Sequence, residues 1–338
     1  MMDQPIVTGI LSYGMSGRVF HAPFVNANPG FRLYAVTERS SKNAQKRYPE
    51  IISYNSVEEL LNDQAIELVI VNTPNNTHFE YALKALQAGK HVLVEKPFAA
   101  TSAEAKQLFD LGREKGCKVM VYQNRRWDSD FQQVKSVIRG GLLGDPMEVY
   151  FRYDRYRREI SQKTFKEENL PASGLTYDLG PHLLDQAISI FGKPASFSKT
   201  TGIFRPGSQV DDYVHFHLKY EGGLNVFLTS SLLVAQPLPS FVVHGTEGTF
   251  IKSRTDVQEA QLEKGISPLE EGYGVEPDGS EGQLTTIDKE GNKQSQYLTS
   301  LRSTYNHLFQ AVFSCIRKNE PFPVSEEEII WQMEILES

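Results

Sequence analysis

The sequence is poor in cysteine and has no long apolar run. Only Cys117 and Cys315 occur in 338 residues, far apart and in segments of helical character. Two such cysteines support neither a disulfide framework nor a zinc cluster, so we predict no metal site and a reduced, cytoplasmic setting. No apolar stretch approaches the roughly 20 residues that a membrane span needs, and residues 1–5 lack the basic start of a leader. We expect no membrane partner.

An excess of positive charge is also absent. The net charge is -7 at pH 7, and residues of both signs are interspersed along the chain. Nucleic acids and anionic membranes attract basic surfaces, so neither is an expected partner, and a small molecule remains. Hydrophobic residues make up 40% of the chain and charged residues 23%, as in ordinary globular proteins. The length predicts two domains.

Short apolar strands alternate with helical segments through residue 122. This alternation is typical of a doubly wound, mostly parallel sheet, and we assign residues 1–123 to such an α/β domain. The expected strands lie at 6–11, 31–37, 66–71, within 89–98, and at 118–122. Ligands of such sheets bind beside the carboxyl ends of the strands.

A glycine-containing turn follows the first expected strand and precedes a helix. Small residues there let the backbone approach a pyrophosphate, and the amides at the start of the helix attract the anion. The turn departs from the dinucleotide fingerprint because a serine stands at its first glycine, and an ordinary tight turn is the alternative. The candidate cofactor-binding residues are Ser12, Gly14, Met15, Ser16 and Gly17.

The second expected strand ends in a charged turn, where the adenosine ribose would be recognised. Glu38 can accept a hydrogen bond from a ribose 2'-hydroxyl, which would indicate NAD. Arg39, Ser40 and Lys42 can instead hold a 2'-phosphate, which would indicate NADP. We favour NADP and keep NAD open, and a solvated turn without a ligand is the structural alternative.

Polar residues also follow the next two expected strands. Thr73, Pro74 and His78 come after the strand at 66–71, and they are candidates to line the cofactor site. The strand within 89–98 ends in Glu95 and Lys96. A lysine fixed at such an end can polarise a carbonyl or stabilise an oxygen during chemistry. The alternative is a water-exposed ion pair at the end of a strand.

Residues 124–338 are assigned to a second domain. Its strands, such as 148–157 and 213–218, alternate polar and apolar positions, which predicts an open, mostly antiparallel sheet in an α+β domain. The free face of that sheet suggests a homo-oligomer, a dimer or a tetramer. Because ligand sites favour domain junctions, we name Asn124, Arg125 and Trp127 as candidate substrate-binding residues. Arg155, on the strand at 148–157, is a fourth candidate because it can hydrogen-bond a polyol, and a solvated strand face is the alternative.

The segment 173–187 carries a second group of chemically capable residues. If a helix begins at Asp178, then Asp178 and His182 lie on one face of it, with Pro181 tolerated in the first turn. A histidine suits proton transfer to or from a hydroxyl group near neutral pH. Helix capping by Asp178 and a structural role for His182 are the alternatives.

Taken together, these motifs resemble the Gfo/Idh/MocA oxidoreductase family over nearly the whole chain. The resemblance is carried by the glycine turn, by Thr73-Pro74 with His78, by Glu95-Lys96-Pro97 and by the spacing from Asp178 to His182. Residues 124–131 and 177–182 are similar to the branch that contains NADP-dependent scyllo-inositol 2-dehydrogenases. The resemblance implies a Rossmann domain followed by a domain built on an open antiparallel sheet.

The resemblance also implies an activity. Lys96 would sit beside the nicotinamide and the substrate oxygen, Asp178 and His182 would lie across the cleft, and His182 would be the acid/base. The expected reaction is hydride transfer between NAD(P) and a secondary alcohol or ketone of a cyclic polyol or sugar. The alternatives are a sugar or anhydrosugar reductase, and a cofactor-binding regulator without turnover.

Overall fold

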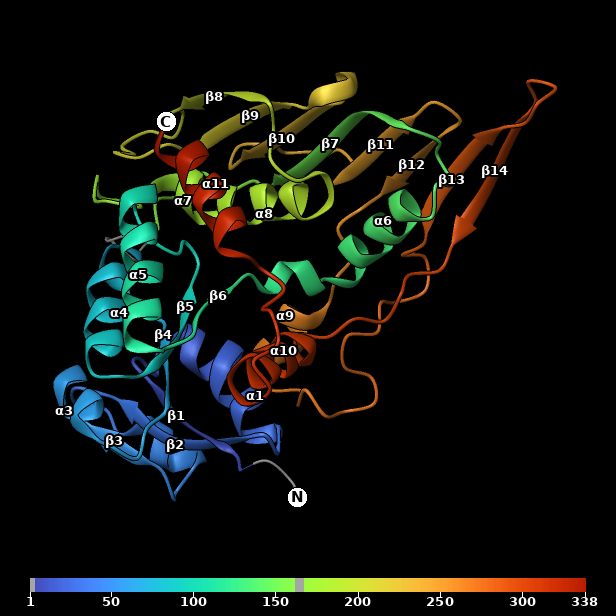
Figure 1. The fold of residues 1–338 in the computed structure, drawn as a ribbon. Helices are drawn as coiled ribbons and strands as arrows, with labels where there is room; N and C mark the ends of the chain where they lie inside the picture. The colour runs from blue at the N-terminus through green and yellow to red at the C-terminus, as the bar shows by residue number, and fades with distance from the viewer. Residues whose placement is uncertain (1–3, 162–166) are drawn as a thin grey trace. The chain divides into compact units, whose positions relative to one another are not determined.

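The computed structural model describes residues 4–161 and 167–338, and its chain forms two compact units (Figure 1). Residues 1–3, at the start of the predicted first domain, and 162–166, within the second, lie outside the described residues. Unit 1 comprises 1–124, 258–273 and 304–333, and unit 2 comprises 125–257, 274–303 and 334–338. The units are therefore not contiguous in sequence, and the domain boundary at residue 123 stays a prediction.

Unit 1 is built on a six-stranded parallel sheet in the order β3-β2-β1-β4-β5-β6. The strand order reverses between β1 and β4, so this sheet is doubly wound, as predicted from the sequence. The strands are β1 (Ile6–Ile10), β2 (Phe31–Thr37), β3 (Ile52–Tyr54), β4 (Leu68–Val71), β5 (His91–Glu95) and β6 (Val119–Tyr122). All four residues of β4 are buried, because helices on both faces leave a central parallel strand no polar side.

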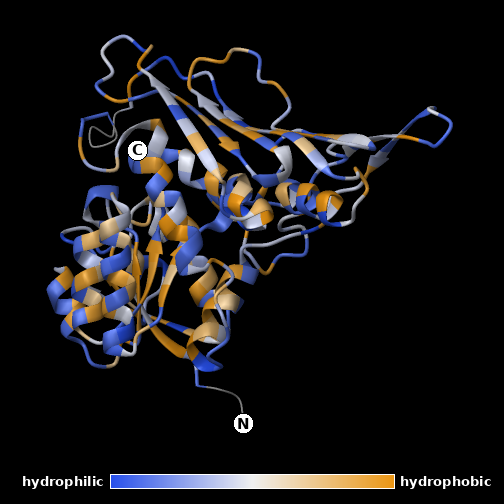
Figure 2. Cartoon of the chain, turned by 45° about the horizontal axis from the view of Figure 1, so that its top comes forward, coloured by the Kyte–Doolittle hydropathy of each residue, from blue (hydrophilic) through white to orange (hydrophobic). Residues whose placement is uncertain are grey.

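Helices cover the sheet of unit 1. Its chain forms η1 (Gly17–His21), α1 (Ala22–Ala27), α2 (Asn43–Arg47), α3 (Val57–Asn62), η2 (Asn75–Thr77), α4 (His78–Gln87), α5 (Ser102–Lys115), α9 (Gln258–Glu263) and α10 (Asn306–Arg317). Helices α4 and α5 pack side by side on the sheet (Figure 1). The Thr101 hydroxyl caps α5 by accepting a hydrogen bond from the Glu104 amide, 3.1 Å away. In unit 1, apolar residues concentrate in the strands, such as β4 and β5 (Figure 2).

Unit 2 is built on an eight-stranded sheet in the order β14-β13-β12-β11-β7-β10-β9-β8. Only the β7–β10 pair is parallel among the strand pairs of this sheet in the described chain, so the sheet is mostly antiparallel, as predicted. The strands are β7 (Pro146–Asp154), β8 (Ser196–Gly202), β9 (Tyr213–Lys219), β10 (Asn225–Ser231), β11 (Phe241–Gly245), β12 (Gly248–Lys252), β13 (Gly282–Ile287) and β14 (Lys293–Leu298).

Three helices lie on one face of this sheet, α6 (Ser129–Arg139), α7 (Gly174–Asp178) and α8 (Gly180–Phe191) (Figure 1). Alternate residues of β7 and β9 are buried beneath them, which is the expected pattern for a sheet with one covered face. The division between the two units falls within η3 (Asn124–Trp127) and within α11 (Glu326–Glu337). The 3-10 helix η5 (Glu221–Gly223) joins β9 to β10. In the part of the chain described, no helix is both long and apolar enough to cross a membrane.

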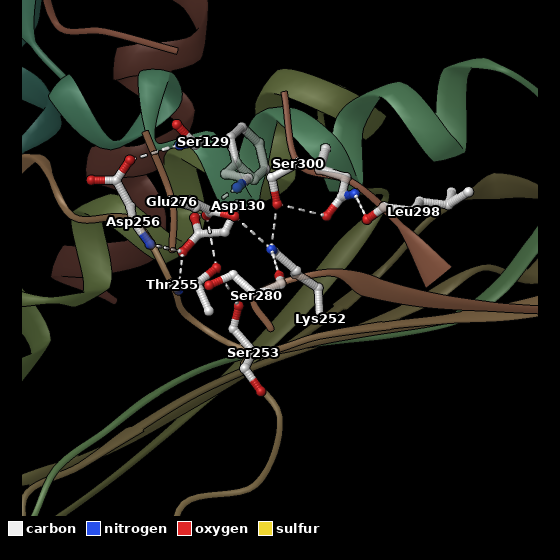
Figure 3. A network of polar contacts seen from close by, with 12 residues as sticks. Ser129, Asp130, Lys252, Ser253, Thr255, Asp256, Glu276, Ser280, Leu298 and Ser300 are labelled. Atoms are coloured by element: carbon white, nitrogen blue, oxygen red, sulfur yellow. Dashed lines mark hydrogen bonds and ion pairs between the residues drawn. The ribbon is translucent and has the colours of Figure 1, made fainter. Parts of the chain in front are cut away.

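A buried polar network organises one part of unit 2 (Figure 3). The ammonium group of Lys252, with a fully buried side chain, lies 2.8 Å from Glu276 and 2.6 Å from the Ser300 hydroxyl, and it also donates to the Ser280 carbonyl. Nearby, Asp130 accepts hydrogen bonds from the amides of Thr255 and Asp256 at 2.7 and 2.9 Å. The network ties β12 to the loops on both sides of β13 and β14.

We expect the Lys252→Met substitution to lower the free energy of unfolding by about 3–5 kcal/mol, because it leaves the Glu276 carboxylate buried without its cation. Urea denaturation followed by tryptophan fluorescence measures the change. Lys289→Met is the matched control, since Lys289 is exposed, and its effect should stay within about 0.5 kcal/mol. Equal stability of the two variants would show that the network contributes little.

Candidate functional site

The glycine turn of unit 1 is anchored at its first residue. Ser12 follows β1, its amide donates to the Asn72 side-chain oxygen at 2.9 Å, and the Asn72 amide group returns a bond to the Ser12 carbonyl at 2.8 Å. Ser12 is not among the residues with positive φ, so a serine fits here without backbone strain. Asn72, the residue after β4, therefore fixes the position of the turn.

Gly17 is required for the close approach of the helix to the strand. A Cβ atom at this position would lie 2.0 Å from the Ser12 carbonyl oxygen, which no side chain can accommodate. Gly14 is exposed, and a Cβ there would meet only the Ser12 hydroxyl, at 3.4 Å. The turn thus combines a tight inner side with an outer side that a ligand can approach, and Met15 is also exposed on it. This arrangement fits the pyrophosphate of a dinucleotide.

Glu95, the last residue of β5, joins this turn to the neighbouring strand end. Its Oε1 accepts hydrogen bonds from the Ser16 hydroxyl at 2.7 Å and from Nε2 of His21 at 2.8 Å, and its Oε2 accepts from the Lys96 amide at 3.2 Å. Burial raises the pKa of the carboxyl group, but the bonds and charge of His21, the Ser16 bond and the Lys96 charge outweigh burial, so the pKa is lowered. Glu95 is therefore an anion at neutral pH.

Lys96 follows Glu95 at the carboxyl end of β5, and it is half-buried. The next bond, Lys96–Pro97, is a cis peptide. The ring of His78 lies between two backbone carbonyls, with Nδ1 2.7 Å from that of Pro97 and Nε2 2.9 Å from that of Thr73. Burial lowers the pKa of His78 despite these two carbonyls, so the ring is neutral and its single N–H donates to one of them. The His78 ring therefore lies between the residues that follow β4 and β5 and bonds to one of the two segments.

Two side chains of the charged turn after β2, those of Glu38 and Lys42, hydrogen-bond to other groups of the protein. The Glu38 carboxylate accepts from the amides of Asn43 and Ala44, at 2.9 and 3.1 Å, and so caps α2 from outside. The Lys42 ammonium donates to two backbone carbonyls and to the Asn55 side chain, at 2.8–3.2 Å. Arg39 and Ser40 are exposed. The freely presented groups of the turn are thus the guanidinium and the hydroxyl.

In unit 2 the structure corrects one local prediction. Asp178 ends helix α7 and does not begin a helix, and His182 lies in the first turn of α8, so the two are not four apart on one helix. Leu179, with φ -112° and ψ -24°, forms the joint between α7 and α8. Pro181 does fall in the first turn of α8, where its missing amide costs no hydrogen bond. His182 is buried, with 3% of its surface exposed.

The helix that carries Asp178 is held at its start by a residue distant in sequence. Asp211 accepts hydrogen bonds from the Thr176 amide at 2.7 Å and the Thr176 hydroxyl at 2.8 Å. Its backbone carbonyl accepts from the Leu175 amide at 2.9 Å. These acceptors satisfy amides that a helix start leaves without intrahelical partners. The chain begins α7 early for this reason, at Gly174.

The four predicted substrate-binding residues differ in their surroundings. Arg125 is buried and lies 3.5 Å from Asp128, whose pKa is raised well above the usual range by burial and by the charge of Asp256. Asn124 is also buried, whereas Trp127 is half-buried and Arg155 is exposed. Asn124 belongs to unit 1 and the other three belong to unit 2.

Comparison with protein families identifies both parts of the chain. Residues 6–123 match the model of the GFO/IDH/MocA oxidoreductase family with an NAD-binding Rossmann fold, and residues 131–251 match the model of its C-terminal domain. The chain belongs to the GFO/IDH/MocA oxidoreductase family. It is therefore an oxidoreductase with an NAD(P)-binding Rossmann domain, as its motifs predict.

Several members of the GFO/IDH/MocA family are similar over nearly their whole length. The scyllo-inositol 2-dehydrogenase (NADP(+)) IolW of Bacillus subtilis is 35% identical, covering 98% of this chain and 92% of that protein. An uncharacterized oxidoreductase of Schizosaccharomyces pombe, C115.03, is 36% identical, covering 99% and 96%. Among solved structures, the oxidoreductase yvaA of Bacillus subtilis has a TM-score of 0.95 at 35% identity, covering 100% of this chain and 96% of that one.

Sequence reasoning did not assign three residues that hold candidate residues, or the helix that carries one, in place within each unit of this GFO/IDH/MocA member. They are His21, Asn72 and Asp211. Asn72 had a usable signal, because it begins the polar run after a buried strand. His21 and Asp211 had none, since their partners lie 74 and 35 residues away in sequence.

Proposed function

We propose that this protein transfers a hydride between NAD(P) and a secondary alcohol or ketone carbon of a cyclic polyol or sugar, in the manner of a scyllo-inositol dehydrogenase. The observation that carries the proposal is the arrangement at the strand ends of unit 1, where Lys96 follows the Glu95 carboxylate that holds the glycine turn. The name of the 35% identical relative, a scyllo-inositol 2-dehydrogenase, supports the substrate class.

In this proposal Lys96, Asp178 and His182 carry out the chemistry at the substrate. A bound nicotinamide supplies the carbon that accepts or gives the hydride. When an alcohol is oxidised, His182 takes the hydroxyl proton while the hydride leaves the same carbon, and the alcohol becomes a ketone. The Lys96 ammonium stabilises the oxygen through this change of charge, and Asp178 orients the histidine or binds a substrate hydroxyl.

The glycine turn and the strand ends are the proposed cofactor site. Ser12, Gly14, Met15, Ser16 and Gly17 would form the pyrophosphate-binding turn, because Asn72 holds Ser12 in place and Gly14 and Met15 are exposed. Thr73 and Pro74 would line the nicotinamide end, where the His78 ring lies beside the Thr73 carbonyl. Asn124, Arg125, Trp127 and Arg155 remain the proposed substrate contacts.

We expect Arg39→Ala to weaken NADP binding about tenfold and to leave NAD binding within twofold, because the exposed guanidinium would bind the 2'-phosphate. Titration of the purified protein with NADPH and NADH, followed by fluorescence, measures both affinities. Arg47→Ala, at an exposed arginine on α2, is the control. An unchanged ratio of the two affinities in the Arg39 variant would contradict its role in choosing NADP.

We also propose that the protein is a homo-oligomer, a dimer or tetramer, formed through the open face of the eight-stranded sheet. On that face the rings of Tyr150 and His217 stack on Phe227, with centroids 5.0 and 4.4 Å apart. Such an aromatic surface suits burial against a second copy. Sedimentation velocity should give at least the mass of a dimer, and a 38.2 kDa species alone would contradict the proposal.

The deciding experiment is the cofactor titration followed by a turnover screen over inositols, aldoses and glucosides with the preferred cofactor. Glucosides are included because a D-glucoside 3-dehydrogenase of Escherichia coli is 30% identical over 58% of this chain. Turnover of an inositol or its ketone supports the proposal. Turnover of linear or anhydro sugars alone would favour the reductase alternative, and binding without any turnover would favour a regulator.

A further inference from the structure

His21, a buried histidine that we did not predict as a site residue, contacts the carboxylate of Glu95. His21 is the last residue of the π-helix η1, which begins at Gly17 directly after the glycine turn. Its side chain is fully buried, and its Nε2 lies 2.8 Å from Oε1 of Glu95. Single π-helical turns are rare and often occur at functional sites.

The direction of this hydrogen bond follows from the charge of its partner. An ionised carboxylate can only accept, and the Ser16 hydroxyl already donates to the same Oε1 at 2.7 Å, so Nε2 of His21 must carry a proton. Nδ1 of His21 has no hydrogen-bond partner among the described residues. The ring otherwise packs edge-on against Tyr122, with centroids 4.4 Å apart. The polar function of His21 is thus the single bond to Glu95.

Glu95 also bonds to two parts of the proposed site. Through Ser16 it holds the glycine turn, and through its Oε2 it accepts from the backbone amide of Lys96. One carboxylate therefore fixes the distance between the proposed phosphate loop and the proposed catalytic lysine. Without His21 the carboxylate would keep only its bonds to hydroxyl and amide, and a buried anion with fewer donors rotates or draws in water.

We propose that His21 is a positioning residue for hydride transfer. It acts through Glu95 and holds the glycine turn and Lys96 in their positions relative to each other. The inference rests on the proposed function for its catalytic part, whereas its cofactor part depends only on the Rossmann domain. A misplacement of about 1 Å in such a site can lower turnover by about 100-fold. His21 itself touches neither cofactor nor substrate in this proposal.

The test compares two substitutions at this position. His21→Phe keeps an aromatic ring in the buried space and removes the donor, while His21→Gln keeps a donor. We expect His21→Phe to raise the dissociation constant for NADPH and to lower kcat, each by about 10- to 100-fold. His21→Gln should recover most of both. His91→Phe is the control, because His91 accepts from the Lys118 amide at the opposite end of the same strand, and it should change neither value more than twofold.

A double-variant comparison shows whether His21 acts through Glu95. The His21→Phe/Glu95→Gln protein should bind NADPH no more weakly than Glu95→Gln alone, since both changes break one linkage. The proposal would be overturned if the double variant weakened NADPH binding by the product of the two single effects. It would also be overturned if the dissociation constant and kcat of His21→Phe stayed within twofold of the unchanged protein. If His21→Phe does not fold, His21→Asn, whose shorter side chain cannot reach Oε1 of Glu95, should weaken NADPH binding about tenfold relative to His21→Gln. If no polyol is turned over, the proposed function fails, and NADPH affinity still tests His21.

Discussion

The Lys96→Ala protein should lose about 10²–10³-fold in kcat on the inositol that the screen identifies, with its dissociation constant for NADPH within about threefold of the unchanged protein. The ammonium group acts on the substrate oxygen as charge develops, so its loss is felt in the transition state more than in binding. Steady-state kinetics with saturating cofactor measures kcat, and the fluorescence titration measures binding.

Lys96 lies at the end of β5 beside a carboxylate that is ionised, so an ammonium there is held by charge as well as by the strand. Lys106→Ala is the control, because its side chain is 63% exposed on α5, and kcat should not change. Turnover close to normal in Lys96→Ala, with an intact fold by circular dichroism, would remove the lysine from the mechanism.

His182→Asn should lower kcat for alcohol oxidation by about 10²–10⁴-fold. The imidazole is the proposed base, and an asparagine of similar size cannot take a proton. The pH profile gives a second readout. If His182 is the base, kcat of the unchanged protein rises with pH as the base loses its proton, and the variant lacks this rise. The comparison requires the rates of both proteins across a range of pH.

His307→Asn is the matched control for this change, because His307 is an exposed histidine on α10. It should keep both the rate and the pH profile. A His182→Asn protein that retains the rising limb would show that another group takes the proton. A variant that loses rate equally at every pH, with a changed fold, would indicate that the buried His182 is structural in α8.

The two architectures were predictable from local patterns. Strand β4 is apolar and buried at all four positions, which indicates a parallel sheet covered on both faces. Strand β9 alternates buried and partly exposed positions, which indicates an antiparallel sheet with one open face. Both predictions are confirmed, as is the family, because its motifs combine several short signals in one order. Local patterns failed at Asp178, which ends α7 and does not begin a helix, because contacts from Asp211 start α7 at Gly174.

By itself, the sequence determined the fold class, the order of the strand ends and the residue types available for chemistry. Only the tertiary structure decided how these groups are used: Lys42 is taken up by backbone carbonyls, His78 lies between two strand ends, and Glu95 binds Ser16 and His21. The reason is physical. Periodicity reports which face of an element is buried, whereas hydrogen bonds between side chains 74 or 79 residues apart depend on strand order and on packing between elements.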